Sequence, residues 1–156
     1  MSGFTNKALS ETFKGNLDWD DDALKIMLVD STFVFDPDKW EVDQNDDSVN
    51  DAHHHEIAVT GYAGGYGGVG RKAATVVISE DDTNDQMDLT FSDLTWVSLG
   101  AGATIGMALL IKEMGGDDVS SMILYALDLV DTPTVGGDFQ LDFSATGNVS
   151  VNSIGA

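Results

Sequence analysis

Apolar side chains near the start of the chain recur close to the spacing of one helix face. These positions are Phe4, Ala8, Leu9 and Phe13. Gly15 follows them and is a typical stop signal, because glycine adopts the backbone conformation that ends a helix. The pattern predicts a short N-terminal helix at about 4–14.

Most residues at 23–30 are apolar, and they fall on both faces of the strand that this segment would form. One face carries Leu24, Ile26 and Leu28, and the other carries Lys25, Met27 and Val29. A strand that is apolar on both faces is typical of the centre of a sheet, where both faces are covered. We therefore expect a central strand here.

Further short runs rich in β-branched and alternating apolar residues follow, separated by Gly and Asp. They lie at 55–60, 72–79, 86–91, 94–99, 104–113, 122–130, 139–143 and 148–154. The run at 104–113 is long enough for a helix, but its flanking glycines favour a buried strand. This spacing predicts a mainly β fold, an antiparallel β-sandwich of about seven to eight strands with the short N-terminal helix appended.

Between about 31 and 54 the periodicity gives way to acidic residues. We expect a long surface excursion, with one helical turn after Pro37 and Trp40 as an anchor. No internal repeat or linker interrupts the chain, and 156 residues suit one compact domain, so a single domain is expected over 1–156.

Charge sets limits on the partners. The chain has 27 acidic and 7 basic residues, a net charge of −20, and 22 of the acids are Asp. Such a surface repels phosphates, so nucleic acid is not expected as a partner. Molar salt screens the self-repulsion, and the composition therefore favours a saline or halophilic setting. A surface that binds cations or a basic partner is the alternative.

Composition also argues against cysteine-dependent proteins and membrane proteins. There is no Cys, so disulfides, thiolate metal sites and thiol catalysis are excluded. No apolar run approaches a membrane span, and the first residues lack the pattern of a signal peptide, so no membrane partner is expected.

A glycine-rich segment at 62–72 is the first candidate for chemistry. It superficially resembles a phosphate-binding loop, but Arg71-Lys72-Ala73 replaces the Gly-Lys-Ser/Thr that such a loop requires before a helix. We expect a flexible surface loop, with Tyr62 and Tyr66 suited to contact with another protein. Arg71 and Lys72 add a basic pair that can dock an acidic neighbour.

The remaining candidates concern metals. Three adjacent histidines at 53–55 point in different directions in a strand, so a polar, pH-sensitive strand start is favoured over zinc. Oxygen ligands suited to Ca²⁺ or Mg²⁺ occur at Asp81, Asp82, Asn84 and Asp85. That run lacks the Gly and Glu of an EF-hand loop, and a solvated acidic face is favoured over a metal site.

Catalysis finds little support. No Gly-x-Ser-x-Gly elbow is present. A carboxylate pair for glycoside hydrolysis stays open, since acids are frequent and nothing singles out two of them. A metal-dependent hydrolase rests on acid abundance alone. We expect no enzyme, no catalytic residue and no cofactor.

The order of segments resembles a family of small structural proteins of tailed bacteriophages and related viruses. The similar segments are Asn6-Lys7 through Phe13 and Gly15, Leu17-Asp18-Trp19, the strand 24–31, Glu56-Ile57-Ala58-Val59-Thr60-Gly61-Tyr62, the glycine stretch 64–72, and 91–96, 110–113, 124–128 and 136–143. Each motif alone is common, and their order over nearly the whole chain is what is specific. Phe143 in place of the family's usual Trp and the acidic stretch 36–51 are departures.

This resemblance implies an architectural role in the virion and no catalytic residues. It suggests a capsid decoration or turret protein that binds the major capsid protein as a cyclic homo-oligomer, or a tail or baseplate accessory protein that binds tail proteins. The expected contact residues are Tyr62, Tyr66, Arg71, Lys72, Phe4 and Phe13. A secreted carbohydrate-binding module that stacks sugars on Trp19, Trp40, Tyr62 and Tyr66 is the alternative from another class.

Overall fold

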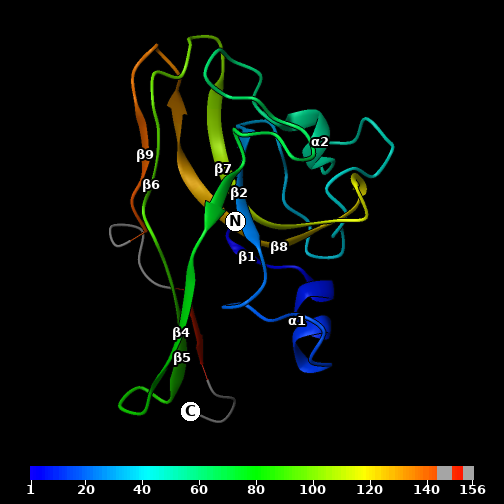
Figure 1. The fold of residues 1–156 in the computed structure, drawn as a ribbon, viewed down its shortest axis with the longest axis vertical. Coiled ribbons are helices and arrows are strands. Elements are labelled where there is room, and N and C mark those ends of the chain that lie inside the picture. Colours follow the sequence, from blue (N-terminus) through cyan, green and yellow to red (C-terminus); the bar gives the residue numbers. More distant parts are fainter. Residues whose placement is uncertain (144–148, 153–156) are drawn as a thin grey trace.

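Strand β2 (Leu24–Asp30) lies inside a five-stranded sheet, as its apolar faces predict. The computed structural model describes residues 1–143 and 149–152, and the sheet in it has the order β1 (Gly3–Phe4), β8 (Asp117–Pro133), β7 (Thr104–Met114), β2 and β3 (Lys72–Ala74). All its neighbouring strands run antiparallel (Figure 1). The prediction of a central strand is confirmed.

Two smaller sheets cover one face of this large sheet. One contains β10 (Val149–Asn152), β5 (Gln86–Phe91) and β4 (Val76–Asp81), and the other pairs β6 (Leu94–Trp96) with β9 (Phe139–Leu141). Leu89, Trp96 and Leu141 from these sheets share a core with Ile26 and Leu110 of the large sheet. The predicted mainly β, antiparallel, sandwich-like fold with a short N-terminal helix is confirmed.

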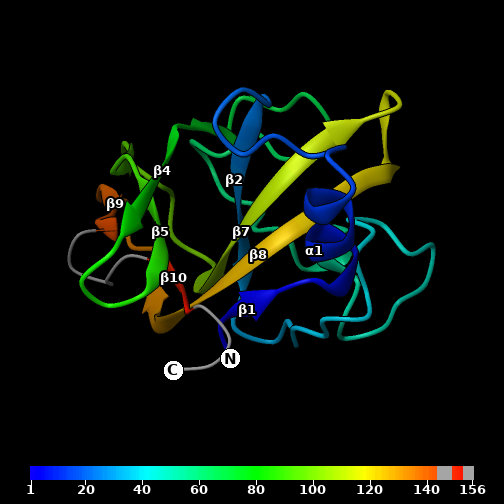
Figure 2. The same cartoon turned by 90° about the horizontal axis from the view of Figure 1, so that it is seen from below.

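The opposite face of the large sheet is covered by the segment that the sequence marked as a surface excursion. Its Phe33, Phe35, Val42 and Ala52 form a second core against side chains of β2, β7 and β8 such as Met27. In Figure 2 this segment (cyan) and the smaller sheets lie on opposite sides of the large sheet. A buried aromatic ring removes some 150–250 Å² from water, which explains how an acid-rich segment packs as a layer. The expectation of a purely surface excursion is therefore corrected.

Helix α1 (Asn6–Phe13) lies within the predicted range 4–14. It begins at Thr5, whose Oγ1 accepts a hydrogen bond from the Ala8 N–H at 3.2 Å and donates one to the Ile123 carbonyl at 2.7 Å. A side chain that caps a helix and also binds a neighbouring strand fixes the helix on the sheet. The last helical residue, Phe13, is 89% exposed.

The local differences from the expected strands have simple causes. The strand expected at 55–60 is wrong: helix α2 (Ala52–His55), capped by Asp51, occupies its start, and only Glu56 bridges to Val29. The run at 72–79 divides at Thr75 into β3 and β4, because the chain passes there from one sheet to another.

The remaining predicted elements agree with the structure or differ at their ends. Residues 104–113 form strand β7 rather than a helix, and a turn at Gly115-Gly116 joins it to β8, which starts earlier and ends later than the predicted 122–130. After Pro37 a single turn, Lys39 N–H to the Asp36 carbonyl at 3.0 Å, replaces the expected helical turn. Strand β10 matches 149–152 of the run expected at 148–154, whose other residues lie outside the described ones. No helix of the described residues has the length and hydropathy to span a bilayer.

Candidate functional site

The arginine at the end of the glycine-rich segment is the centre of a buried ionic cluster. The Arg71 side chain is fully buried, and its Nε and Nη2 donate to the two oxygens of Glu56 at 2.8 and 2.7 Å. Its Nη1 and Nη2 donate to the two oxygens of Asp118 at 2.6 and 2.9 Å, and Nη1 also donates to Glu113 at 3.2 Å. A guanidinium has five N–H donors. All of them are therefore used inside the protein.

The cluster favours the ionised forms of Asp118 and Glu113. Burial alone would raise the pKa of Asp118, but the hydrogen bonds and charge of Arg71 outweigh it and hold that pKa below its ordinary value. The same balance lowers the pKa of Glu113, where Lys25 contributes most to the lowering and its Nζ lies 2.6 Å from Glu113 Oε2. Burial lowers the pKa of Arg71, yet Glu56 and Asp118 reverse this and raise it. Asp118, Glu113 and Arg71 are therefore held in their charged forms.

The glycine-rich segment folds around these carboxylates. Gly65 N–H donates to Glu56 Oε2 at 2.8 Å, and Gly67 N–H donates to Glu113 Oε1 at 3.0 Å. Both glycines have positive φ, at 79° and 70°, which other residues rarely adopt. A Cβ on Gly64 would lie 2.7 Å from Glu56 Cδ. The N–H groups that resemble a phosphate cradle in the sequence thus bind the chain's own carboxylates.

Tyr62 completes this arrangement from inside the protein. Its hydroxyl donates to Glu56 Oε1 at 2.9 Å and accepts from the Leu28 N–H of β2 at 3.1 Å. Burial raises the pKa of Tyr62, so the hydroxyl stays protonated and can donate. The ring therefore ties the glycine-rich segment to the central strand.

Four of the six expected contact residues contact other side chains of the protein itself. Tyr62 and Arg71 are 5% and 2% exposed, so the prediction that they contact a partner at the surface is wrong. Phe4 packs edge-on against Trp19 and Tyr125, with ring centroids 5.7 and 4.8 Å away. The fourth, Lys72, places its Nζ 5.9 Å from the centroid of the Trp96 ring and is only half-buried.

The other two expected contact residues lie at the surface. Tyr66 is 43% exposed on the glycine-rich segment, and Phe13 is 89% exposed at the end of α1. Val69, which the sequence reading did not single out, is 83% exposed beside Tyr66 in the chain. The buried cluster therefore holds a short loop that presents Tyr66 and Val69 outward.

The residues that the sequence offers as weak metal-ligand candidates occupy the tip of the β4–β5 hairpin, at the bottom of Figure 1. The Asp81 carboxylate accepts from the N–H groups of Thr83 and Asn84 at 3.0 and 3.1 Å and from Asn84 Nδ2 at 2.7 Å. It therefore stabilises the turn itself. Asp82 and Asp85 belong to the same tip, and no group of three or more metal-ligating acids or histidines comes together in the part of the chain that the structure describes.

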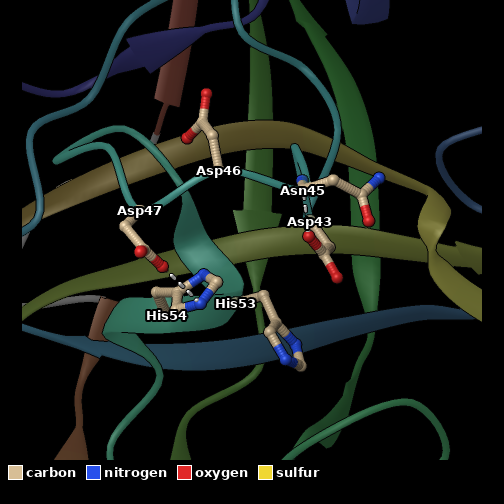
Figure 3. A pocket seen from close by; sticks show the side chains of 6 residues that line it. All are labelled: Asp43, Asn45, Asp46, Asp47, His53 and His54. Carbon is tan, nitrogen blue, oxygen red and sulfur yellow. Dashed lines mark hydrogen bonds and ion pairs between the residues drawn. The ribbon is translucent and has the colours of Figure 1, made fainter.

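A shallow hollow of about 310 Å³ lies where the acidic stretch 36–51 meets α2. Its lining, drawn in Figure 3, consists of Asp43, Asn45, Asp46, Asp47, His53 and His54. His54 points toward Asp47, whereas His53 points away from the acids of the hollow. His53 Nδ1 instead lies 3.0 Å from Asp118 Oδ2, so the hollow is connected to the Arg71 cluster.

The cluster has the chemistry of a scaffold. Every donor of Arg71 is satisfied and the side chain is closed to solvent, so Arg71 has no N–H group left to bind a ligand. What the arrangement does is position a loop and fasten β8, β7 and the start of β3 to one point. Comparison of the chain with protein-family models, with curated proteins and with solved structures found no match.

Sequence reasoning missed the three carboxylates of the cluster. Glu56, Glu113 and Asp118 are widely separated in a chain rich in acids, so nothing in the local pattern indicates that they meet. One signal was present: Arg71 is the only arginine beside six lysines. Arginine alone offers a planar fork for two-point binding of carboxylates, so Arg71 is the basic residue of the chain best suited to a carboxylate site.

Replacement of Asp118 by Asn should lower the free energy of unfolding by about 1–3 kcal/mol at pH 7, because Arg71 loses a charge-assisted partner. A carboxyl with a lowered pKa in the fold stabilises above its unfolded pKa, and this contribution disappears as the pH falls through the folded value. The difference between wild type and D118N should therefore shrink from pH 7 to pH 3. Urea unfolding in 1 M NaCl measures it, with the exposed Glu80→Gln as control; a difference independent of pH would contradict the ion pair.

Proposed function

We propose that the chain is a structural component of a tailed virus particle, a decoration protein on the surface of the capsid. One observation carries this proposal. Glu56, Tyr62 and Arg71, which belong to the virion-protein-like segments of the sequence, converge on one buried cluster through Glu56. Their spacing therefore has a structural reason, as expected of an architectural protein in which such segments hold the fold.

The surface around the cluster supports binding to another protein. Tyr66 and Val69 lie on a loop fixed by hydrogen bonds, so little conformational entropy is lost when a partner covers them. Phe13 on α1 gives a second exposed aromatic group. The major capsid protein is the proposed partner, with the chain arranged as a cyclic homo-oligomer where the capsid presents repeated sites. The strongly acidic surface fits the outside of the particle, because packaged DNA repels it.

A tail or baseplate accessory protein uses the same surfaces and stands as the second candidate. The carbohydrate-binding alternative needs exposed aromatic rings on which sugars can stack. Trp19 and Tyr62 are only 6% and 5% exposed, so neither offers such a ring. Trp40 is half-buried and lies under the Lys7 ammonium, whose Nζ is 5.4 Å from the ring centroid. Tyr66 is the remaining exposed ring among the four aromatic residues considered for stacking.

If the proposal holds, genes for head proteins should lie beside its own, and co-expression of the chain with those head proteins tests the binding. The wild-type protein should sediment with assembled heads, and F13A/Y66A should lose at least tenfold in occupancy while its unfolding free energy changes by less than about 1 kcal/mol. Val77→Ala, which removes an exposed side chain on β4, is the matched control and should leave occupancy unchanged.

Two results would count against this reading. Equal occupancy of F13A/Y66A and wild type would place the contact elsewhere on the surface. A wild-type protein that binds neither heads nor tails, or whose gene lies among metabolic genes, would overturn the virion assignment itself.

A further inference from the structure

Three loops at one end of the sandwich contain no charged residue. They are 57–61, 97–103 and 132–137, with Asp131 and Asp138 at their border in the sequence. The three loops lie together at the top of Figure 1. In a chain with a net charge of −20, this uncharged end is a distinct surface.

Hydrogen bonds between main-chain groups hold the three loops together. The Gly100 N–H donates to the Thr60 carbonyl at 2.7 Å and so joins the first loop to the second. The Leu99 N–H donates to the Gly137 carbonyl at 2.9 Å, and the Leu99 carbonyl accepts from the Gly136 N–H at 2.7 Å. These two bonds join the second loop to the third. Loops fixed in this way lose little conformational entropy when another protein covers them.

Apolar side chains are exposed at the uncharged end. Val97 in the second loop is 65% exposed, and Val135 in the third loop is 77% exposed. A small pocket of about 40 Å³ lies beside Val135, and Leu99, Ile105 and Phe139 are among the residues that line it. Exposed apolar groups that gather beside a recess are typical of a surface that contacts another protein.

The charge of the chain favours a second copy as the partner of this end. The segments 18–22, 36–51 and 80–88 contain four, seven and five acids. Two copies that met through such segments would bring like charges together, which opposes association. The uncharged end lets two acidic copies come into contact without this local repulsion. A basic partner, by contrast, gains most from the acidic segments and finds no charge to pair with at this end.

We infer that two copies of the chain contact each other through their uncharged ends, as a two-fold dimer in which each end faces the same end of its partner. Apolar burial around Val97 and Val135 holds the dimer, while salt screens the repulsion between the rest of the two copies. Dimerisation therefore strengthens from 0.1 M to 2 M NaCl. The inference rests on the closed homo-oligomer of the proposed function, whose contact it locates, but not on binding to a capsid.

Sedimentation equilibrium in 2 M NaCl tests this contact. The wild-type protein should form dimers of twice its mass of 16.6 kDa. Val135→Asp should raise the dissociation constant of the dimer at least about tenfold, because each copy then places a charge in an apolar contact. Val77→Asp adds the same charge at an exposed position of β4 and should leave the constant within about twofold of the wild-type value. Circular dichroism checks that both variants keep the fold.

A single thiol gives a readout that does not disrupt the contact. The chain has no Cys, so Val135→Cys and Val77→Cys each carry one reactive group. In 2 M NaCl the V135C thiol should react with a maleimide at least about fivefold more slowly in the dimer than in the diluted monomer, because the core of an interface is closed to solvent. The V77C thiol should react at the same rate in both.

A wild-type protein that stays monomeric at millimolar concentration in 2 M NaCl, or a dimer that V135D leaves unchanged, would overturn the inference. Protection of V135C only when capsid heads are present would also overturn it, since the uncharged end then contacts the capsid protein. The two proposals fail separately. A monomer that binds heads contradicts the dimer alone, whereas a dimer that binds neither heads nor tails contradicts the role in the virion alone.

Discussion

Replacement of Arg71 by Ala should lower the free energy of unfolding by about 3–5 kcal/mol, the cost expected when one partner of a buried ion pair is removed. The variant leaves Glu56 and Asp118 buried without the guanidinium that all four of their side-chain oxygens bind. The glycine-rich segment and the Tyr62 hydroxyl depend on the same Glu56, so the loss extends beyond a single bond. Urea unfolding in 2 M NaCl measures the change.

Two further variants separate the geometry of Arg71 from its charge. Arg71→Lys retains the positive charge but not the planar fork, and should recover only part of the stability. Lys14→Ala removes an exposed cation that pairs with Glu11 on α1, and should change the unfolding free energy by less than about 0.5 kcal/mol. A loss below 1 kcal/mol for R71A would mean that the cluster contributes little to the fold.

Raising NaCl from 0.1 M to 2 M should increase the midpoint of thermal unfolding by roughly 10 °C, a shift that corresponds to a few kcal/mol in a domain of this size. The cause is self-repulsion at a net charge of −20, which molar salt screens to distances of about 3 Å. Differential scanning calorimetry at pH 7 provides the measurement.

A variant with fewer acids distinguishes screening from a general effect of salt on apolar burial. The acidic stretch 36–51 offers four aspartates for this variant, namely Asp36, Asp38, Asp46 and Asp47. Changing all four to Asn removes four negative charges and brings the net charge from −20 to about −16. That variant should melt higher than wild type at 0.1 M and respond less to salt. A midpoint that stays flat or falls with salt would contradict the saline setting inferred from composition.

The sequence predicted those parts of the fold whose burial shows in a regular period. Strand β2 was predicted to be central because side chains on both of its faces are apolar, and each face meets its own core. The second layer escaped prediction for a physical reason. Phe33, Phe35 and Val42 have no regular spacing among the acids, and only the presence of an uncovered sheet face makes them bury.

The candidate site was predictable in its elements and not in its arrangement. The segment 62–72 and its Arg71 stand out in the sequence, but whether an arginine points outward or inward depends on which acids the fold brings to it. Glu113 and Asp118 approach Arg71 because the tight turn at Gly115-Gly116 keeps the ends of β7 and β8 together. The local sequence pattern does not indicate that these two carboxylates contact Arg71.

The position of β2 between β3 and β7 has a consequence for the order of events during synthesis. Its neighbours are encoded about 45 and 80 residues later, so β2 leaves the ribosome long before either pairing partner exists. The β7–β8 hairpin, by contrast, closes through a tight turn and can form as soon as both strands are made. Such distant pairings slow folding relative to local ones. The hydrogen-bonding edges of β2 thus stay unpaired until β3 and the β7–β8 hairpin have been made, so the large sheet cannot assemble until most of the chain has left the ribosome.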